Sequence, residues 1–297
     1  MSYTNGQDNP QLFFQVKLYS GTGSSLALTF DGTEDMQANL VWLKCRSHSG
    51  ITLGGSYNNT NASGRTYLAL AWKEASGIFD IVSYTGNGSN RNISHNLSAV
   101  PTMMIHKSRD NASYMWGVYH KALGNQKNLN LNSNASQNDD SGGVYYNSTS
   151  PTSSVFSLGT NVGYNKNTDD YIAYLFGDRQ GICKMFSYSG NGSTNGTYVH
   201  LGFSPELIIW KNATTSNLQG WWMVDAKRDT YNVADENLRP SGSGAASESY
   251  DMLDFTANGF KVRWDDDAIN DSGETFVGMA FAKAPFVNSK GVPANAR

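Results

Sequence analysis

An internal repeat is the feature that most constrains how this chain folds. The segment IVSYTGNGS at residues 81–89 returns as MFSYSGNGS at residues 185–193, and a diverged copy, VKLYSGTGS, lies at residues 16–24. Each copy is followed by an apolar stretch that ends in lysine, and the three lysines are Lys44, Lys107 and Lys211. Self-similarity at a fixed spacing indicates a fold assembled from related structural units.

The spacing of these markers predicts two complete units and one short unit. Tyr84 lies 23 residues before Lys107, and Tyr188 lies 23 residues before Lys211. A third marker closes each unit, in the strands RTYLALAWK, DDYIAYLFGD and ETFVGMAFAK. In the first unit this third marker follows the lysine about 41 residues sooner than in the other two units, so we expect the first unit to lack its middle strands. Because that loss would leave strands unpaired, we also expect the three units to share sheets, with separate sandwiches as the alternative.

The markers divide the chain into five parts. They are an N-terminal arm (residues 1–11), a truncated first unit (12–77), a second unit (78–181), a third unit (182–286) and a C-terminal tail (287–297). Arms of this kind either fray or are ordered by a neighbouring subunit.

Within each unit the residue pattern is that of β-strands. FDIVSY at residues 79–84 alternates and is rich in aromatic and β-branched residues. The glycines that follow Tyr84 and Tyr188 predict turns in which φ is positive. Short apolar strands with turn residues between them predict an all-β fold, a β-sandwich or jelly-roll-like architecture built from three related repeats. No stretch combines a helical period with helix end signals.

Charge and cysteine content exclude several classes of function. Only 16% of the 297 residues are charged and the net charge is −3, so no nucleic-acid partner and no basic surface for anionic lipid is expected. No window approaches the roughly 18 apolar residues of a membrane span. The N-terminal sequence lacks a secretory signal pattern. Cys45 and Cys183 are expected to be reduced thiols, with a single bridge as the alternative.

Glycoside cleavage is the enzymatic alternative, because it needs two carboxyl groups roughly 5–9 Å apart. Asp80, Asp225 and Asp254 lie in apolar strands, but none has an acidic partner two positions away on the same strand face. The histidines lack zinc-site spacing, and no nucleotide-binding glycine motif precedes a helix. We therefore expect a protein that is not an enzyme and has no cofactor. A glycan depolymerase whose carboxylate pair forms between distant strands is the runner-up.

The densest acidic segment, RWDDDAINDSGE at residues 263–274, is a candidate calcium site. Calcium takes six to eight oxygen ligands, and Asp265, Asp267 and Asp271 are the candidate ligands. The counterpart loops of the other two units lack this acid density. A solvated hairpin tip is therefore the alternative interpretation.

Tryptophans are the candidate recognition residues. Trp221 and Trp222 are adjacent, so on a strand their side chains face opposite ways, and one of them is available for a second packing layer or for exposure. Trp116 is the expected counterpart in the second unit, and Trp264 lies beside the acidic segment. An exposed indole suits either a sugar ring or a protein interface, and core packing is the third interpretation.

Together, these markers resemble the repetitive, β-rich virion structural proteins of tailed bacteriophages, best known from marine phages. The resemblance extends from residue 16 to about residue 286, and the truncated first unit departs from it. It rests on YTGNG (84–88), WGVYHKAL (116–123), TSPTSSVFSLG (149–159), YSGNG (188–192), WMVDAKRDTYN (222–232), NGFKVR (258–263) and MAFAKAPF (279–286).

The resemblance implies an abundant, non-enzymatic virion component that assembles in the host cytoplasm with other virion proteins. We expect an outward-facing protein on a tail fibre, a tail appendage or the capsid surface, assembling as a homo-oligomer or on a symmetric platform. Its expected task is host-surface adhesion by lectin-like binding of cell-surface glycans, through many weak copies acting together. A purely structural capsid cement protein and a cellular lectin-like module are the alternatives.

Overall fold

The computed structural model describes residues 9–47, 58–215, 220–240, 245–248, 250–287 and 290–293. Antiparallel strands form almost all of its regular structure, and each of the three α-helices in this described part is a single turn. The predicted all-β class is therefore confirmed. Most of the predicted N-terminal arm, and the end of the predicted C-terminal tail, lie outside the described residues.

The first unit forms one sheet of three strands, in the order β1-β3-β2. Its central strand, β3, pairs antiparallel with both neighbours. Its elements are the 3-10 helix η1 (Pro10–Leu12), β1 (Phe14–Ser20), β2 (Leu40–Cys45), α1 (Asn58–Asn61) and β3 (Thr66–Trp72).

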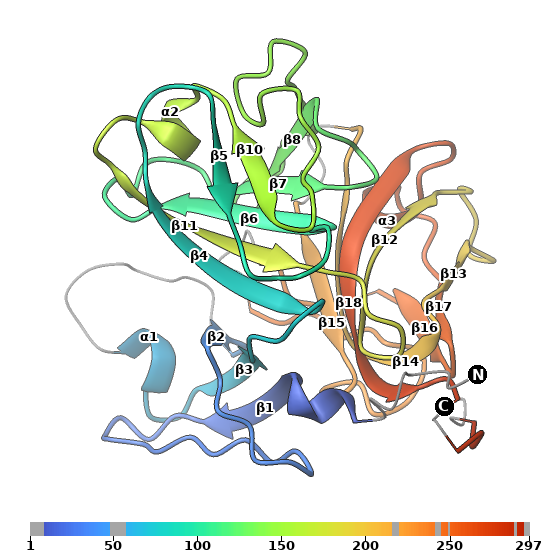
Figure 1. The fold of residues 1–297 in the computed structure, drawn as a ribbon. Coiled ribbons are helices and arrows are strands. Elements are labelled where there is room, and N and C mark those ends of the chain that lie inside the picture. The colour runs from blue at the N-terminus through green and yellow to red at the C-terminus, as the bar shows by residue number, and fades with distance from the viewer. Residues whose placement is uncertain are drawn as a thin grey trace.

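The second unit forms a two-layered sandwich, at the top of Figure 1. A sheet in the order β4-β11-β6-β7-β8-β9 packs against the pair β10-β5. The elements are β4 (Phe79–Thr85), β5 (Arg91–Ser94), β6 (Met103–Ser108), β7 (Gly117–His120), β8 (Lys127–Asn130), β9 (Asn138–Asp139), β10 (Val155–Leu158), α2 (Val162–Asn165) and β11 (Asp170–Phe176).

The third unit forms a second sandwich, on the right of Figure 1. A sheet in the order β12-β18-β14-β15 packs against β13-β17-β16. The elements are β12 (Cys183–Ser189), β13 (Tyr198–His200), β14 (Phe203–Asn212), β15 (Trp222–Asp225), β16 (Leu253–Thr256), β17 (Gly259–Val262), α3 (Asp267–Asn270) and β18 (Thr275–Pro285).

The three large sheets begin with the same strand order. In each unit the closing strand lies between the strand before the glycine turn and the lysine-ended strand, as β1-β3-β2, β4-β11-β6 and β12-β18-β14. This shared order supports the predicted repeat. The expectation that units share sheets is wrong, because every named sheet draws its strands from one unit. The short first unit instead ends its sheet at β2.

A buried asparagine fixes the glycine turn of the second unit. The Asn165 side chain accepts from the N–H of Asn87 at 3.0 Å and donates to the carbonyl of Ser89 at 2.7 Å. The N–H of Gly88 also donates to the Asn165 carbonyl at 2.7 Å. Gly88 has a φ of +70°, and a Cβ at Gly86 would lie 2.1 Å from the Lys166 carbonyl oxygen. The turn therefore requires glycine at both positions.

The same contacts occur in the other two units. Each one-turn helix ends in an asparagine whose side chain holds the backbone of the glycine turn. The corresponding residues are Asn270, Asn191 and Ser193 in the third unit, and Asn61, Thr22 and Ser24 in the first. Asn165 and Asn270 are fully buried, whereas Asn61 is partly exposed.

One central core joins the units. The inward faces of the three large sheets meet there, and the two sandwiches each have a further core between their layers. Contributions to the central core include Trp72 from the first unit, Ile105 from the second, and Ile209, Met279 and Phe281 from the third. The aromatic rings of Trp72 and Phe281 meet edge to face with centroids 5.7 Å apart. The units are therefore held together by a shared apolar interior.

Candidate functional site

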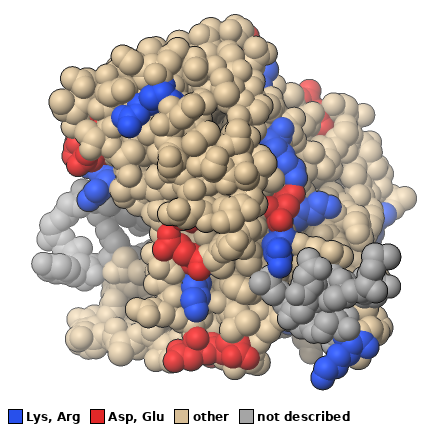
Figure 2. Space-filling model, viewed as in Figure 1, with Lys and Arg blue, Asp and Glu red and all other residues tan. Residues whose placement is uncertain are grey.

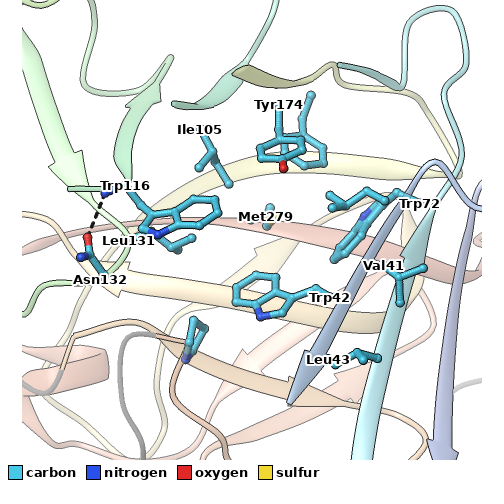
Figure 3. Close-up of a pocket in the computed structure, with 13 residues that line it drawn as sticks. Val41, Trp42, Leu43, Trp72, Ile105, Trp116, Leu131, Asn132, Tyr174 and Met279 are labelled. Carbon is cyan, nitrogen blue, oxygen red and sulfur yellow. Dashed lines mark hydrogen bonds between the residues drawn. The ribbon is translucent and has the colours of Figure 1, made fainter. Parts of the chain in front are cut away.

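An aromatic hollow of about 390 Å³ lies where the first unit meets the other two. The side chains project into it from strands of all three units, as Figure 3 shows. We call it the junction hollow. Its lining residues are Leu40, Val41, Trp42, Leu43, Trp72, Ile105, Trp116, Leu131, Asn132, Tyr174, Phe176, Pro240 and Met279.

Aromatic rings form much of the wall of the junction hollow. Trp42 and Trp116 are half-buried and point into it, and Trp72 closes its inner end. The rings of Trp116 and Tyr174 are nearly parallel, with centroids 6.5 Å apart. Burial raises the pKa of the Tyr174 hydroxyl, so this group stays neutral. The hollow therefore presents flat, uncharged surface.

Polar groups are scarce in the junction hollow. Its described lining contains no charged residue, and Asn132 is its one amide side chain. The Oδ1 atom of Asn132 accepts from the backbone N–H of Trp116 at 3.0 Å, which leaves the amide nitrogen for a ligand. A sugar site usually offers several convergent hydrogen-bonding groups to hydroxyls. The lining therefore favours an apolar group, such as a protein side chain.

The molecule's charge distribution agrees with this description. In Figure 2, charged side chains are few and scattered, and broad areas of the second unit carry none on the face shown. The chain has 22 basic and 25 acidic residues, and neither sign dominates that face. Long-range electrostatic steering of a charged ligand is therefore not a feature of this surface.

Strand β2 forms one rim of the junction hollow. Leu40 and Trp42 point towards the central core, whereas Val41 and Leu43 point to the opposite face of the sheet. All four residues nevertheless line the hollow. A hollow that touches consecutive residues runs along the edge of a strand, not across one face. The described part of the chain places no strand beside this edge.

Of the alternatives predicted for the paired tryptophans, exposure is wrong and a second packing layer is observed. Trp221 and Trp222 do face opposite ways, but both are fully buried. Trp221 lies in the central core and donates its indole N–H to the Asn130 carbonyl at 2.9 Å. Trp222 lies in the core of the third unit, with the Arg239 guanidinium 4.1 Å from its ring centroid. Neither indole is available to a glycan, because both faces of this sheet are covered.

The other two candidate tryptophans, Trp264 and Trp116, differ in whether their ring faces are covered. Trp264 is partly buried and stacks on Tyr250 with centroids 4.1 Å apart, so its ring face is occupied. Trp116 occupies the register position of Trp221, two residues before Val118, but it lines the junction hollow. Of the four tryptophans singled out from the sequence, Trp116 alone lies in the candidate site.

The structure does not support the predicted calcium site. Among the described residues, no group of three or more histidine, cysteine or acidic side chains is arranged to hold a metal ion. Asp265 and Asp267 point to solvent, and Asp271 follows α3. The neighbouring Asp266 caps this helix, accepting from the Ala268 N–H at 2.8 Å. The acidic segment therefore serves as a helix start and an exposed loop.

The candidate catalytic aspartates are each held by structural partners. Asp80 accepts from the Asn96 N–H at 2.7 Å, and Asp254 forms an ion pair with Arg263 at 3.3 Å. Asp225 is fully buried and bonds the Arg228 guanidinium at 2.5 Å. These contacts give the three carboxylates positions in the fold without bringing them together as an acid–base pair.

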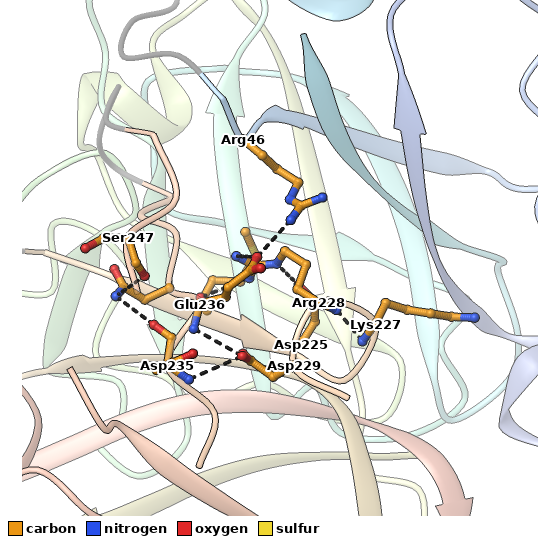
Figure 4. A network of polar contacts seen from close by, with 10 residues as sticks. Arg46, Asp225, Lys227, Arg228, Asp229, Asp235, Glu236 and Ser247 are labelled. Atoms are coloured by element: carbon orange, nitrogen blue, oxygen red, sulfur yellow. Dashed lines mark hydrogen bonds and ion pairs between the residues drawn. The ribbon is translucent and has the colours of Figure 1, made fainter. Parts of the chain in front are cut away.

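A buried ionic network extends from Asp225 to the first unit, as Figure 4 shows. Arg228 lies 4.0 Å from Glu236, which also pairs with Arg46 just after β2 at 2.8 Å. Burial raises the pKa of the nearby Asp229 to about 6, because its charged form is poorly solvated. The network therefore fastens a loop of the third unit beside the end of β2.

The two cysteines are free and buried, as expected for reduced thiols. Burial raises the pKa of the Cys183 thiol to about 12, so it is a packing residue and not a nucleophile. No helix in the described part of the chain is long and apolar enough to cross a membrane.

Sequence reasoning missed most of the junction hollow. Trp42 lies in the stretch LVWLK, which has the pattern of a buried strand, and Tyr174 lies in an ordinary closing strand. The available signal was the missing middle of the first unit. A unit without its middle strands leaves β2 at an edge, and the residues on β2 then become the candidates.

The fold and the hollow define an all-β protein with an uncharged aromatic recess and no recognised catalytic arrangement in its described part. A family model described as Domain of unknown function (DUF7483) matches residues 47–285, and the chain belongs to that family. The match begins after β2, so the outer rim of the hollow precedes it. No curated protein and no solved structure matches the chain.

Proposed function

We propose that this protein is a non-enzymatic, outward-facing structural component of a bacteriophage particle, which it joins by binding another virion protein. The observation that carries the binding role is the junction hollow, because an aromatic, uncharged recess at the surface is typical of a protein interaction site. The placement on a phage particle rests on the sequence resemblance. Assembly in the host cytoplasm agrees with two reduced, buried cysteines.

The test is to locate the chain in the purified parent particle by cryo-electron microscopy. A position at the particle surface, in contact with a second virion protein through the face that carries Trp42 and Trp116, is the expected result. Density on the tail would indicate an appendage, and a regular array on the capsid would indicate a decoration or cement protein. Absence from the particle would refute the proposal.

Host-surface adhesion through glycans is the second candidate function. The half-buried Trp116, with the free amide nitrogen of Asn132 beside it, is the observation that favours it. Glycan-array binding that is lost in Trp116→Ala, but kept in Trp264→Ala, would support adhesion. The sparse polar lining makes this role weaker than protein binding.

The depolymerase alternative is disfavoured by the partners of Asp80, Asp225 and Asp254. It predicts release of reducing ends from host polysaccharide, abolished by Asp225→Asn or Asp254→Asn. We expect no such release from the purified protein.

A further inference from the structure

The hydrogen bonds of the first sheet define which backbone groups of β2 face outward. The N–H of Arg46 donates to the Thr66 carbonyl at 2.8 Å, which continues by one position the register that places Cys45 opposite Tyr67. Hydrogen-bonded positions alternate along an antiparallel strand. The N–H and C=O groups of Val41 and Leu43 therefore point away from β3, towards the open edge.

The equivalent groups of the other units are covered by a fourth strand. In the second unit, β7 pairs with β6 on the side of Met104, and in the third unit β15 pairs with β14 on the side of Ile208. Val41 has the same register position as Met104 and Ile208, and the described residues place no strand beside it. The first unit thus has the receiving strand without the described strand that would cover it.

The junction hollow lies where the fourth strand of the first unit would place its inward side chain. In the second unit, Val118 of β7 lies opposite Ile105, and in the third unit, Met223 of β15 lies opposite Ile209. All four of these side chains are in the central core. Trp42 has the register position of Ile105 and Ile209, and it lines the hollow.

We propose that an extended segment of a second polypeptide adds to β2 as an antiparallel fourth strand and inserts an apolar side chain into the junction hollow. This inference deepens the proposed function, since it names the class of partner. Backbone hydrogen bonds to Val41 and Leu43 would supply affinity, and the hollow would supply selectivity for alternate apolar residues. The chain's own β7 and β15 indicate the sequence expected of the partner segment, which is a tryptophan, one intervening residue, and then Val or Met.

The partner is a polypeptide and not a sugar for two reasons. The hollow is continuous with the outer edge of β2 at Val41 and Leu43, where the described residues place no strand and which only another backbone can complete. The lining also lacks the polar groups that hydroxyls need, as described above. Both sister units fill the corresponding place with a strand of this same chain.

The test uses labelled synthetic peptides and the full-length protein. The probes are GWWMVDAK, which copies residues 220–227, and MWGVYHKA, which copies residues 115–122. Fluorescence anisotropy should show saturable binding with one site per chain, with a Kd on the order of micromolar to hundreds of micromolar. A scrambled peptide, and a GWWMVDAK peptide with proline in place of its valine, whose counterpart Val224 lies opposite Ile208 in the chain's own sheet, are the controls and should bind at least about tenfold more weakly.

Variants of Val41 separate strand addition from simple contact with the hollow. Val41→Pro removes the outward N–H at a position that makes no hydrogen bond to β3, so the fold should be kept. Val41→Ala also removes the branched side chain but retains the N–H, and it is the matched control. Val41→Pro should weaken peptide binding about tenfold or more relative to Val41→Ala. Circular dichroism spectra that match for the two variants would show that both are folded.

The possible outcomes distinguish this inference from the proposed function. Failure of both peptides, equal binding to the two Val41 variants, or a simple sugar that occupies the hollow in competition would overturn strand addition. A particle position without a strand on β2 would leave the virion role intact and refute the inference. Peptide binding by a protein that is absent from the particle would support strand addition and refute the virion role.

Discussion

The first and third units share a strand order and a turn contact, yet they end differently. In the third unit β15 pairs with the lysine-ended strand β14 and covers its edge. In the first unit the described residues place no strand beside the outer edge of the corresponding strand β2. The comparison shows that a sheet without a fourth strand leaves a hollow beside β2, where β7 and β15 place core side chains in the other units.

Replacing a tryptophan in each of these two regions should give the largest difference in the free energy of unfolding. Trp222→Ala removes a fully buried ring and its contact with Arg239, so the free energy of unfolding should fall by about 3–5 kcal/mol. Trp42→Ala removes a half-buried ring beside an existing hollow and should cost about 1–2 kcal/mol. Urea unfolding measures both values. Equal losses would contradict the contrast between a filled core and an open edge.

Replacing the asparagines whose side chains bond the glycine turns should give the next largest loss of stability. Asn165→Ala or Asn270→Ala leaves buried backbone groups without their partners, and each should cost about 2–3 kcal/mol. Asn61→Ala should cost only about 1 kcal/mol, because water can reach the corresponding turn. Chemical denaturation of the three variants tests the ranking. A larger loss for Asn61→Ala than for the other two would reject it.

A buried histidine should make the second unit sensitive to acid. His106 is enclosed by the rings of Phe156, Tyr146 and Tyr164, and burial lowers its pKa to about 3. Between about pH 6.5 and pH 3 the unfolded chain binds a proton that the folded protein does not. Stability should therefore fall with decreasing pH, by up to about 1.4 kcal/mol per pH unit from this group.

The matched variant for this effect is His106→Leu, because Leu43 has the same register position in the first unit. This variant should lose part of the acid sensitivity. His120, whose pKa burial lowers to about 4, should supply the remainder. Thermal unfolding at a series of pH values measures the slope. An unchanged slope in His106→Leu would contradict the assignment.

Replacing the lysines that end equivalent strands should give the smallest changes in the free energy of unfolding. The changes for Lys107 and Lys211 should differ in sign. The ammonium group of Lys107 donates to the carbonyls of Asn111 and Ala112, each at 3.1 Å, so Lys107→Met should destabilise by about 1 kcal/mol. Lys211 is 1% exposed and donates to the Ser133 carbonyl at 3.3 Å. Its replacement by Met should be neutral or slightly stabilising at pH 7, because the burial cost of the charge is removed.

Burial lowers the pKa of Lys211 to about 8, and this predicts a second readout. Between pH 8 and about pH 10.5 the unfolded chain keeps a proton that the folded protein has lost, so stability should rise with pH. Lys211→Met should remove most of that rise, and Lys107→Met should retain most of it, because burial lowers the pKa of Lys107 as well. The check is to measure the unfolding midpoints of the two variants across this pH range. An equal rise in both variants would contradict the assignment to Lys211.

Much of the fold could be predicted because the repeated markers have local causes. The glycine turns and the apolar lysine-ended strands are visible in the sequence, and their strands form as expected. The one-turn helices were missed, because four residues are too few to show a helical period. The asparagines that end them looked like ordinary turn residues, and their partners are distant in sequence.

The site could be predicted only in part. Alternation placed Trp221 and Trp222 on opposite faces, but it could not show that both faces are covered. Trp116 was identified, whereas Trp42 was hidden in an apolar strand whose exposure depends on what lies beside it. Whether a strand is central or at an edge is a property of long-range pairing, which local pattern does not contain.

Hydrogen exchange of the β2 amides tests the open edge most directly. In the free protein, the amides of Val41 and Leu43 should exchange rapidly, whereas those of Met104 and Ile208, under β7 and β15, should be protected. Addition of the GWWMVDAK peptide should slow exchange at Val41 and Leu43. Protection of these two amides in the free protein, equal to that of Met104 and Ile208, would contradict the account.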